Sequence, residues 1–174
     1  MNFKEWGKSV PEEIRADALW SVECYRLALF LGDICWQDAT RLVKDRRTIS
    51  NADQIYRAVG SVAANLEEGY SKGTGKDRAR FYEYSLASAR ESRGWYYRCR
   101  FVLGEKISMP RIRLLTSIIT LLLTMVPEQR RSGPISGRVS EEPAEYQELS
   151  LGSKSLLQLL EDVPMPEEPA IGEE

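Results

Sequence analysis

Arginine and aromatic side chains alternate along residues 78–101, and this combination suits a surface that contacts phosphates and bases. A guanidinium group forms forked hydrogen bonds with phosphate oxygens, and an aromatic ring offers a face on which an unpaired base can stack. The arginines are Arg78, Arg80, Arg90, Arg93, Arg98 and Arg100, and the aromatic residues are Phe81, Tyr82, Tyr84, Trp95, Tyr96, Tyr97 and Phe101. The pattern favours binding of RNA or DNA.

The same residues could instead have only a structural role in the helix. Four of the aromatic residues share one helical stripe with small polar residues and a cysteine, and such a stripe is typical of a helix packed in a core. The stripe consists of Phe81, Tyr84, Ser85, Ser88, Ser92, Trp95, Tyr96 and Cys99. In that interpretation the arginines only solvate the outer face of the helix.

The segment from Gly69 to Asp77 is rich in glycine and carries two lysines. A phosphate loop of the GxxxxGK[ST] type would need glycine in place of Tyr70 and a hydroxyl residue in place of Asp77, and a strand rather than a helix before it. We therefore expect a linker between two helices. Lys72 and Lys76, beside free amides at the start of the helix that follows the linker, could still hold a backbone phosphate of a nucleic acid.

A polar flank runs along the predicted helix before this linker. Arg57, Ser61, Asn65 and Glu68 follow one another at spacings of four, four and three residues, opposite an apolar stripe. The flank could be a solvated face, a hydrogen-bonded network within or between subunits, or a catalytic site. The adjacent Glu67 and Glu68 point in different directions on a helix and cannot form a carboxylate dyad.

The composition excludes most familiar catalytic and metal sites. The 174 residues include no histidine, so a histidine general base, a Ser-His-Asp triad and a histidine metal ligand are all absent. Cys24, Cys35 and Cys99 form no CxxC motif, and we expect buried thiols in a reducing cytoplasm. We predict a non-enzymatic protein with no catalytic residue, no metal site and no cofactor.

The near-neutral net charge of −2 hides a strong asymmetry along the chain. Residues 1–40 carry a net charge of −3, residues 41–131 carry +9, and residues 132–174 carry −8. A basic body fits a polyanionic partner. The acidic tail could fold back on that body and compete with nucleic acid, or recruit a basic partner through Leu156–Leu160.

Apolar residues recur at spacings of three and four and predict an all-α protein, an antiparallel up-down four-helix bundle. Residues 1–16 are an N-terminal extension, residues 17–127 the bundle, and residues 128–174 a disordered acidic, proline-containing tail in which a short amphipathic helix could form. The expected helices span residues 17–44, residues 50–70 after a Ser50–Asp53 cap, residues 75–103 after a Thr74–Asp77 cap, and residues 108–127, from Ser108 and Pro110 to the stop at Pro127.

Two further features bear on partners. The longest apolar run, Ile112–Val126, is too short to span a bilayer, and the first residues lack a signal-peptide pattern, so we expect a cytoplasmic protein without membrane contact. In the last helix, Leu114, Leu121 and Met125 widen the apolar stripe beyond the needs of one bundle. This width favours an alternative function, an oligomeric protein scaffold that binds no nucleic acid.

Residues 57–72, RAVGSVAANLEEGYSK, together with Phe81, Ala87, Ser88 and Glu91 downstream, resemble the family of 23S rRNA intervening-sequence proteins. The family pattern reads approximately RRAxxSIxxNIAEGxxR, followed by FxxxAxGSxxE and a leucine-rich last helix. The accessory variability proteins of diversity-generating retroelements look like members of the same fold. Here Glu67 stands where alanine is usual and Ala87 where glycine is common.

The resemblance implies a small helical bundle that assembles as a ring-like homopentamer and has no enzymatic activity. It also implies a basic surface for RNA or DNA and, in the retroelement branch, a reverse transcriptase as partner. Carried over by position, the structural signature is Arg57, Ser61, Asn65, Glu68, Gly69 and Tyr70. The nucleic-acid-binding residues would be Lys72, Lys76, Arg78, Arg80, Arg90, Arg93, Arg98 and Arg100.

Overall fold

The computed structural model describes residues 1–132 and 154–166, and every regular element in these two segments is a helix. The elements are α1 (Phe3–Ser9), α2 (Glu12–Arg15), a 3-10 turn (Ala18–Ser21), α3 (Glu23–Leu42), α4 (Ile49–Tyr70), α5 (Gly75–Leu103), α6 (Glu105–Arg131) and α7 (Lys154–Glu161). The predicted all-α class is confirmed.

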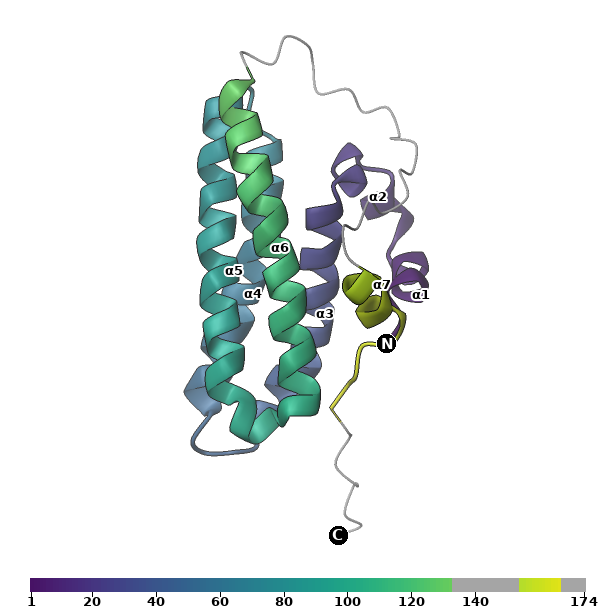
Figure 1. Ribbon diagram of the computed structural model, residues 1–174, viewed down its shortest axis with the longest axis vertical. Helices are drawn as coiled ribbons and strands as arrows, with labels where there is room; N and C mark the ends of the chain where they lie inside the picture. The colour runs from purple at the N-terminus through teal and green to yellow at the C-terminus, as the bar shows by residue number, and fades with distance from the viewer. Residues whose placement is uncertain (133–153, 167–174) are drawn as a thin grey trace.

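Four long helices, α3 to α6, lie side by side around one core (Figure 1). Each contributes an apolar stripe to this core, and residues such as Leu31, Val62, Tyr96 and Leu115 are fully buried. Burying one such side chain favours folding by about 1.5–3 kcal/mol, and this burial offsets the entropy lost on ordering the helices. Each helix packs against the next one in the chain, whereas α3 and α6 touch less extensively. The up-down order stays a prediction.

The first long helix begins later than predicted. The expected helix over residues 17–44 is interrupted at Val22, whose ψ of 109° is extended, and α3 begins only at Glu23. Before it, the Asp17 carboxylate accepts a hydrogen bond from the Leu19 amide at 2.7 Å and starts the 3-10 turn. This turn buries Leu19 and Trp20 against the core, so tertiary packing overrides the helical period.

The expected Ser50–Asp53 cap is wrong, because α4 begins at Ile49 and both residues lie inside the helix. Thr48 precedes the helix, but its side chain accepts no capping hydrogen bond. Its hydroxyl instead donates to the Leu42 carbonyl oxygen at 2.7 Å and closes the α3–α4 connection. The end of α4 at Tyr70 agrees with the prediction.

The third long helix has the predicted bounds, residues 75–103. The Thr74 hydroxyl oxygen accepts from the Asp77 amide at 3.1 Å and donates to the Asp77 carboxylate at 2.6 Å. Gly104, at a φ of 78°, then ends α5 in a conformation that glycine adopts at little cost.

The fourth long helix is wrong at both predicted ends, since α6 runs from Glu105 to Arg131 with Pro110 and Pro127 inside it. A proline removes one helical hydrogen bond, but tertiary contacts hold the last turn in place. The Arg130 guanidinium pairs with the Glu83 carboxylate of α5. A Cβ on Gly75 would lie 2.3 Å from the Gln129 carbonyl oxygen, so the end of α6 packs directly on the backbone of α5.

Both predicted flanking segments contribute to the core. The aromatic rings of Phe3, Trp6, Trp20 and Phe30 contact one another, and the Trp6 indole N–H donates to the Asp33 carboxylate at 2.6 Å. The N-terminal extension is therefore packed on α3.

The predicted acidic tail is described only at residues 154–166, and the rest of the tail prediction lies outside the described residues. Within them, α7 packs against α1 and α6, and Leu156, Leu160 and Val163 are buried in the protein's own core. The Val163 amide donates to the Met1 carbonyl oxygen at 2.9 Å and joins the tail to the N-terminal segment (Figure 1). Competition between the tail and nucleic acid stays a prediction.

Candidate nucleic-acid interface

The eight residues predicted to bind nucleic acid do not form one cluster. All but Lys72 lie on α5, whose 29 residues extend over about 43 Å. We call residues 67–83 and 127–132 the Thr74 end, and residues 41–51 and 97–106 the Phe101 end. The Arg41 side chain donates to the Val102 carbonyl oxygen at 3.3 Å and brings the end of α3 to the end of α5.

The Thr74 end carries Lys72, Lys76, Arg78 and Arg80, and its positive charges are largely compensated. It holds six basic and five acidic residues, a net charge of +1. The Lys72 ammonium lies 3.2 Å from the Glu68 carboxylate, and the Arg78 guanidinium donates to the Tyr70 carbonyl oxygen at 3.0 Å. These two cations are thus engaged by the protein itself.

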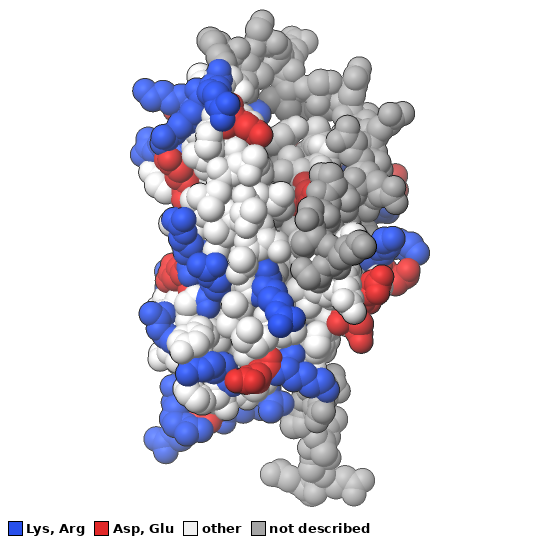
Figure 2. Space-filling view, in the orientation of Figure 1, with Lys and Arg blue, Asp and Glu red and all other residues white. Residues whose placement is uncertain are grey.

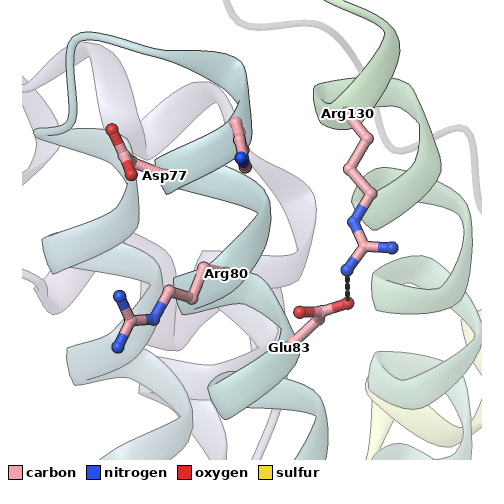
Figure 3. Close-up of a pocket in the computed structure, with 5 residues that line it drawn as sticks. Asp77, Arg80, Glu83 and Arg130 are labelled. Atoms are coloured by element: carbon pink, nitrogen blue, oxygen red, sulfur yellow. Dashed lines mark hydrogen bonds and ion pairs between the residues drawn. The ribbon is translucent and has the colours of Figure 1, made fainter.

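A hollow of about 670 Å³ lies at the same end, between α5 and α6 (Figure 3). Its lining alternates in sign: Lys76, Arg80 and Arg130 are basic, whereas Asp77 and Glu83 are acidic. Arg130 reaches across to Glu83, and the Arg80 side chain donates to the Tyr84 hydroxyl at 2.9 Å. The hollow is therefore a poor phosphate cradle, although Lys76 is exposed beside it.

The middle of α5 carries the other two predicted arginines in different surroundings. Arg90 is exposed, whereas Arg93 is half-buried and donates to the Thr116 hydroxyl of α6 at 3.2 Å. Arg93 thus links two helices of the bundle, and only Arg90 is presented to solvent.

At the Phe101 end, arginine and aromatic side chains stack on each other on the outside of the protein. The Arg98 guanidinium lies 4.7 Å from the centroid of the Trp95 ring. The Arg100 guanidinium lies 3.9 Å from the Tyr97 ring and 4.1 Å from the Phe101 ring. Tyr97 is 58% exposed and Phe101 is 82% exposed, so these rings are available to a ligand.

The charge at the Phe101 end is strongly positive. It holds seven basic residues and two acidic ones, a net charge of +5. The basic residues are Arg41, Lys44, Arg46, Arg47, Arg98, Arg100 and Lys106. The Phe101 end is the lower end of the bundle in Figure 1, and Lys and Arg side chains are visible at this end in Figure 2. The Arg47 guanidinium beside Asp45 lowers the pKa of that carboxyl to about 2.

The aromatic residues of α5 divide differently from the stripe predicted as core. Tyr96, Ser85, Ser92 and Cys99 are buried as expected. The prediction is wrong for Tyr84, which is 44% exposed, while Phe81 and Trp95 are half-buried. Tyr82, outside the predicted stripe, is buried instead. Burial raises the pKa of its hydroxyl to about 12.

A buried ion pair, which the sequence reasoning missed, lies inside the bundle. The Arg111 guanidinium donates to both carboxylate oxygens of Asp38, at 2.9 and 3.1 Å, and the Tyr96 hydroxyl donates to the same carboxylate at 2.9 Å. All three side chains are 0% exposed. Asp38 and Arg111 both occupy apolar-stripe positions of their helices, and that pattern could have revealed the pair.

The signature residues on α4 make local contacts. The Asn65 amide group donates to the Ser61 carbonyl oxygen at 2.7 Å. The Arg57 guanidinium lies 3.7 Å from the Asp53 carboxylate. A Cβ on Gly69 would lie 2.9 Å from atoms of Phe81 and Tyr82 on α5. Any larger residue at position 69 would thus displace the Phe81 or Tyr82 side chain. The Tyr70 ring lies 5.0 Å from the Arg78 guanidinium.

The three cysteines are buried, and burial raises the thiol pKa of Cys24 and of Cys35 to about 12. Such thiols are poor nucleophiles because almost none is ionised near neutral pH. Within residues 1–132 and 154–166, the side chains include no group of three or more potential metal ligands.

The apolar face of α6 is used for packing. By length and composition alone, this described helix could cross a membrane. In the structure it packs against α3, α5 and α7, and Leu114, Ile118 and Leu122 are buried. Leu121 and Met125, which suggested a subunit interface, are partly buried against the same core.

A second hollow, of about 410 Å³, lies between α3 and α4. Its floor includes Gly32, Gly60 and Ala63, and a Cβ on either glycine would meet no atom within 4 Å. Trp36 and Tyr56 stand beside it with ring centroids 5.7 Å apart and are 59% and 44% exposed. This groove presents two exposed aromatic side chains beside small residues of α3 and α4.

Comparison with known proteins supports the resemblance seen in the sequence. Residues 21–103, just under half of the chain, match the family model of the 23S rRNA-intervening sequence protein. This segment is therefore similar to that family. Searches of curated proteins and of solved structures gave no match. The matched segment runs from the start of α3 to the end of α5, and so includes Gly69, Arg98, Arg100 and Phe101.

Proposed function

We propose that the protein binds RNA or DNA through the outer face of α5 and the Phe101 end, without catalysing a reaction. The observation that carries the proposal is the net charge of +5 at this end, together with two exposed aromatic rings in contact with Arg100. A cluster of cations releases counterions from a polyanion, and this release dominates nucleic-acid affinity.

The two ends of α5 provide the test and its matched control. The Arg98→Glu/Arg100→Glu variant should lose more than about tenfold in affinity for a fluorescent RNA or DNA at ~50 mM salt, measured by anisotropy. The Lys76→Glu/Arg80→Glu variant makes the same charge change at the Thr74 end and should lose less than about threefold. If the wild-type protein binds neither nucleic acid at this salt concentration, the proposal is wrong.

We propose further that copies of the chain assemble as a ring-like homopentamer in the cytoplasm. A ring requires two different complementary surfaces on each copy. The α3–α4 groove offers an apolar surface with Asp33 and Glu67 in its lining, which complements a basic face of a neighbouring copy. Native mass spectrometry should show the assembly, and Trp36→Ala/Tyr56→Ala should shift it toward the monomer. A wild-type monomer at micromolar concentration would contradict the assembly.

By the same family resemblance, we propose that the assembly serves as an accessory factor to a reverse transcriptase. If a reverse transcriptase is encoded beside this protein, it should be retained on the immobilised full-length chain at moderate salt.

A protein scaffold without nucleic-acid binding is the alternative function, favoured by the exposed Trp36 and Tyr56. That alternative requires assembly to persist while nucleic-acid binding is absent.

A further inference from the structure

One exposed stripe of α5 leads from its middle to its C-terminal end. Arg90, Gly94, Tyr97 and Phe101 follow at spacings of four, three and four residues, so they lie on the same side of the helix. Of these, Arg90, Tyr97 and Phe101 are exposed. We call Gly94, Tyr97, Arg98, Arg100 and Phe101 the platform.

The Arg100 side chain is fixed between the two exposed rings of the platform. Its guanidinium lies 3.9 Å from the Tyr97 ring and 4.1 Å from the Phe101 ring, and it donates to the Tyr97 carbonyl oxygen at 2.6 Å. This arrangement holds a planar cation beside two aromatic rings before any ligand arrives. A ligand that combines flat aromatic groups with negative charge would stack on the rings and pair with the cation.

Gly94 leaves the surface beside this cluster flat. A Cβ at position 94 would lie 3.4 Å from a terminal nitrogen of Arg98, whose guanidinium lies over the Trp95 ring. A second guanidinium, that of Arg98, and a third ring, that of Trp95, thus continue this surface toward the middle of α5. From Gly94 to Phe101 the platform extends over about 10 Å of helix.

The exposure of Phe101 is the decisive feature. At 82% exposed, its ring contributes little to the core, and it lies beside the exposed Tyr97 ring and the Arg100 guanidinium, where a ligand can reach it. Base pairs in a duplex are stacked on each other and present only their edges and phosphates. Unpaired bases, in contrast, present faces that stack on aromatic side chains and on guanidinium groups.

We propose that the platform binds unpaired bases of a single-stranded RNA or DNA segment, with Phe101 and Tyr97 as stacking surfaces and Arg98 and Arg100 as phosphate contacts. Lys44, Arg46 and Arg47 of the α3–α4 connection, exposed at the same end, attract the adjoining backbone. This inference rests on the proposed function and adds the strand state of the ligand and the residues that read it.

The test compares a labelled single strand of about 12 nucleotides, without self-pairing, with a duplex of the same length at one salt concentration. The full-length protein should bind the single strand more tightly. Phe101→Ala should weaken single-strand binding about 5- to 100-fold, the range found for loss of one stacked base. It should leave duplex binding within about twofold.

Tyr84→Ala is the matched control, because Tyr84 is also an exposed α5 aromatic with a guanidinium, that of Arg80, 5.7 Å from its ring. It directly follows the Thr74 end in the sequence, lies far along α5 from Phe101, and should leave both affinities unchanged. Circular dichroism verifies that both variants are folded. As an independent readout, a 5-iodouridine strand should form photo-crosslinks that mass spectrometry maps to Tyr97 or Phe101.

The outcomes separate the inference from the proposed function. Equal binding of single strand and duplex, with no effect of Phe101→Ala, overturns the platform but leaves nucleic-acid binding in place. A crosslink confined to the Thr74 end does the same. Absence of binding to both probes at ~50 mM salt overturns the proposed function and the platform together. A protein partner on Phe101 would give this last result.

Discussion

The two ends of α5 carry similar numbers of cations and use them in different ways. The Thr74 end has six basic residues among five acidic ones, whereas the Phe101 end has seven basic residues and two acidic ones. Cations lie over aromatic rings at both ends, Lys72 over Phe81 at the first and Arg100 over Tyr97 at the second. At the first end Lys72 and Arg130 also form ion pairs with carboxylates, whereas Arg47 does so at the second. A count of arginines along the helix therefore does not distinguish the two ends, because the nearby acids determine the net charge of each.

The interior beneath the two ends also differs. At the Thr74 end, Gly69 packs against side chains of Phe81 and Tyr82, and Gly75 packs against the backbone at Gln129. Nearer the Phe101 end, Asp38, Tyr96 and Arg111 form a fully buried polar cluster. One end relies on close approach of helices and the other on a buried charge pair, so each responds to a different kind of substitution.

The largest effect is expected from breaking the buried pair. Asp38→Ala leaves the Arg111 charge buried without its carboxylate and should lower the free energy of unfolding by about 3–5 kcal/mol, measured by urea denaturation. The Asp38→Leu/Arg111→Met variant removes both charges and should recover most of that loss. Asp53→Ala, which removes the exposed partner of Arg57, should cost under about 1 kcal/mol. Similar losses for Asp38→Ala and Asp53→Ala would contradict the prediction.

The next largest effect concerns the glycine contact at the Thr74 end. Gly69→Ala places a Cβ 2.9 Å from Phe81 and Tyr82, and should destabilise the protein by about 1–3 kcal/mol. Gly60→Ala is the matched control on the same helix, with no atom within 4 Å, and should stabilise the protein by about 0.5–1 kcal/mol. Thermal unfolding of the two variants should shift in opposite directions, and a shift in the same direction would refute the close-contact argument.

A smaller effect is expected at the start of α5. Thr74→Ala removes the acceptor for the Asp77 amide and should cost about 1 kcal/mol, whereas Thr74→Ser keeps the hydroxyl and should cost less. Hydrogen exchange should increase in the first turn of α5 and remain unchanged near Phe101. If exchange increased equally along the helix, the two ends would not be independent.

The smallest effect is expected on binding rather than on stability. Asp45→Asn removes one of two carboxylates at the Phe101 end and should tighten nucleic-acid binding about twofold at low salt, with no change at high salt. Because Arg47 lowers the pKa of Asp45 to about 2, the carboxylate is ionised throughout the pH range 5–8, and the effect should be the same at both limits. Glu68→Gln, at the Thr74 end, should leave the affinity unchanged. A larger effect of Glu68→Gln would reverse the assignment of the two ends.

The sequence was sufficient for local features of the fold. Thr74, Asp77 and Gly104 predict both ends of α5 correctly, because a capping hydrogen bond and a positive φ depend only on neighbouring residues. Pro127 predicts the wrong end for α6, because the contacts of its last turn with Gly75 and Glu83 come from residues more than forty positions earlier. Val22 likewise interrupts the first helix for tertiary reasons.

The candidate site was predictable only in part, for the same reason. Residue types identified α5 as the basic and aromatic helix. The sequence analysis missed the pairing of Glu68 with Lys72, although their i, i+4 spacing on one helix was a signal for it. The pairing of Glu83 with Arg130 depends on the fold. The exposure of Phe101 also could not be predicted from the sequence. An apolar residue on a basic helix can face either the core or the solvent, and the spacing fits both. A charged residue in each of two apolar stripes, Asp38 and Arg111, was a readable signal.

The pair formed by Asp38 and Arg111 also has a consequence for the order of folding. The two residues are 73 positions apart, whereas α4, α5 and α6 each follow the preceding helix after a short connection. Closing the longer loop costs more chain entropy, so contacts between consecutive helices are favoured early and the joining of α3 to α6 late. In kinetic experiments, substitutions at Asp38 should therefore accelerate unfolding and leave the refolding rate nearly unchanged.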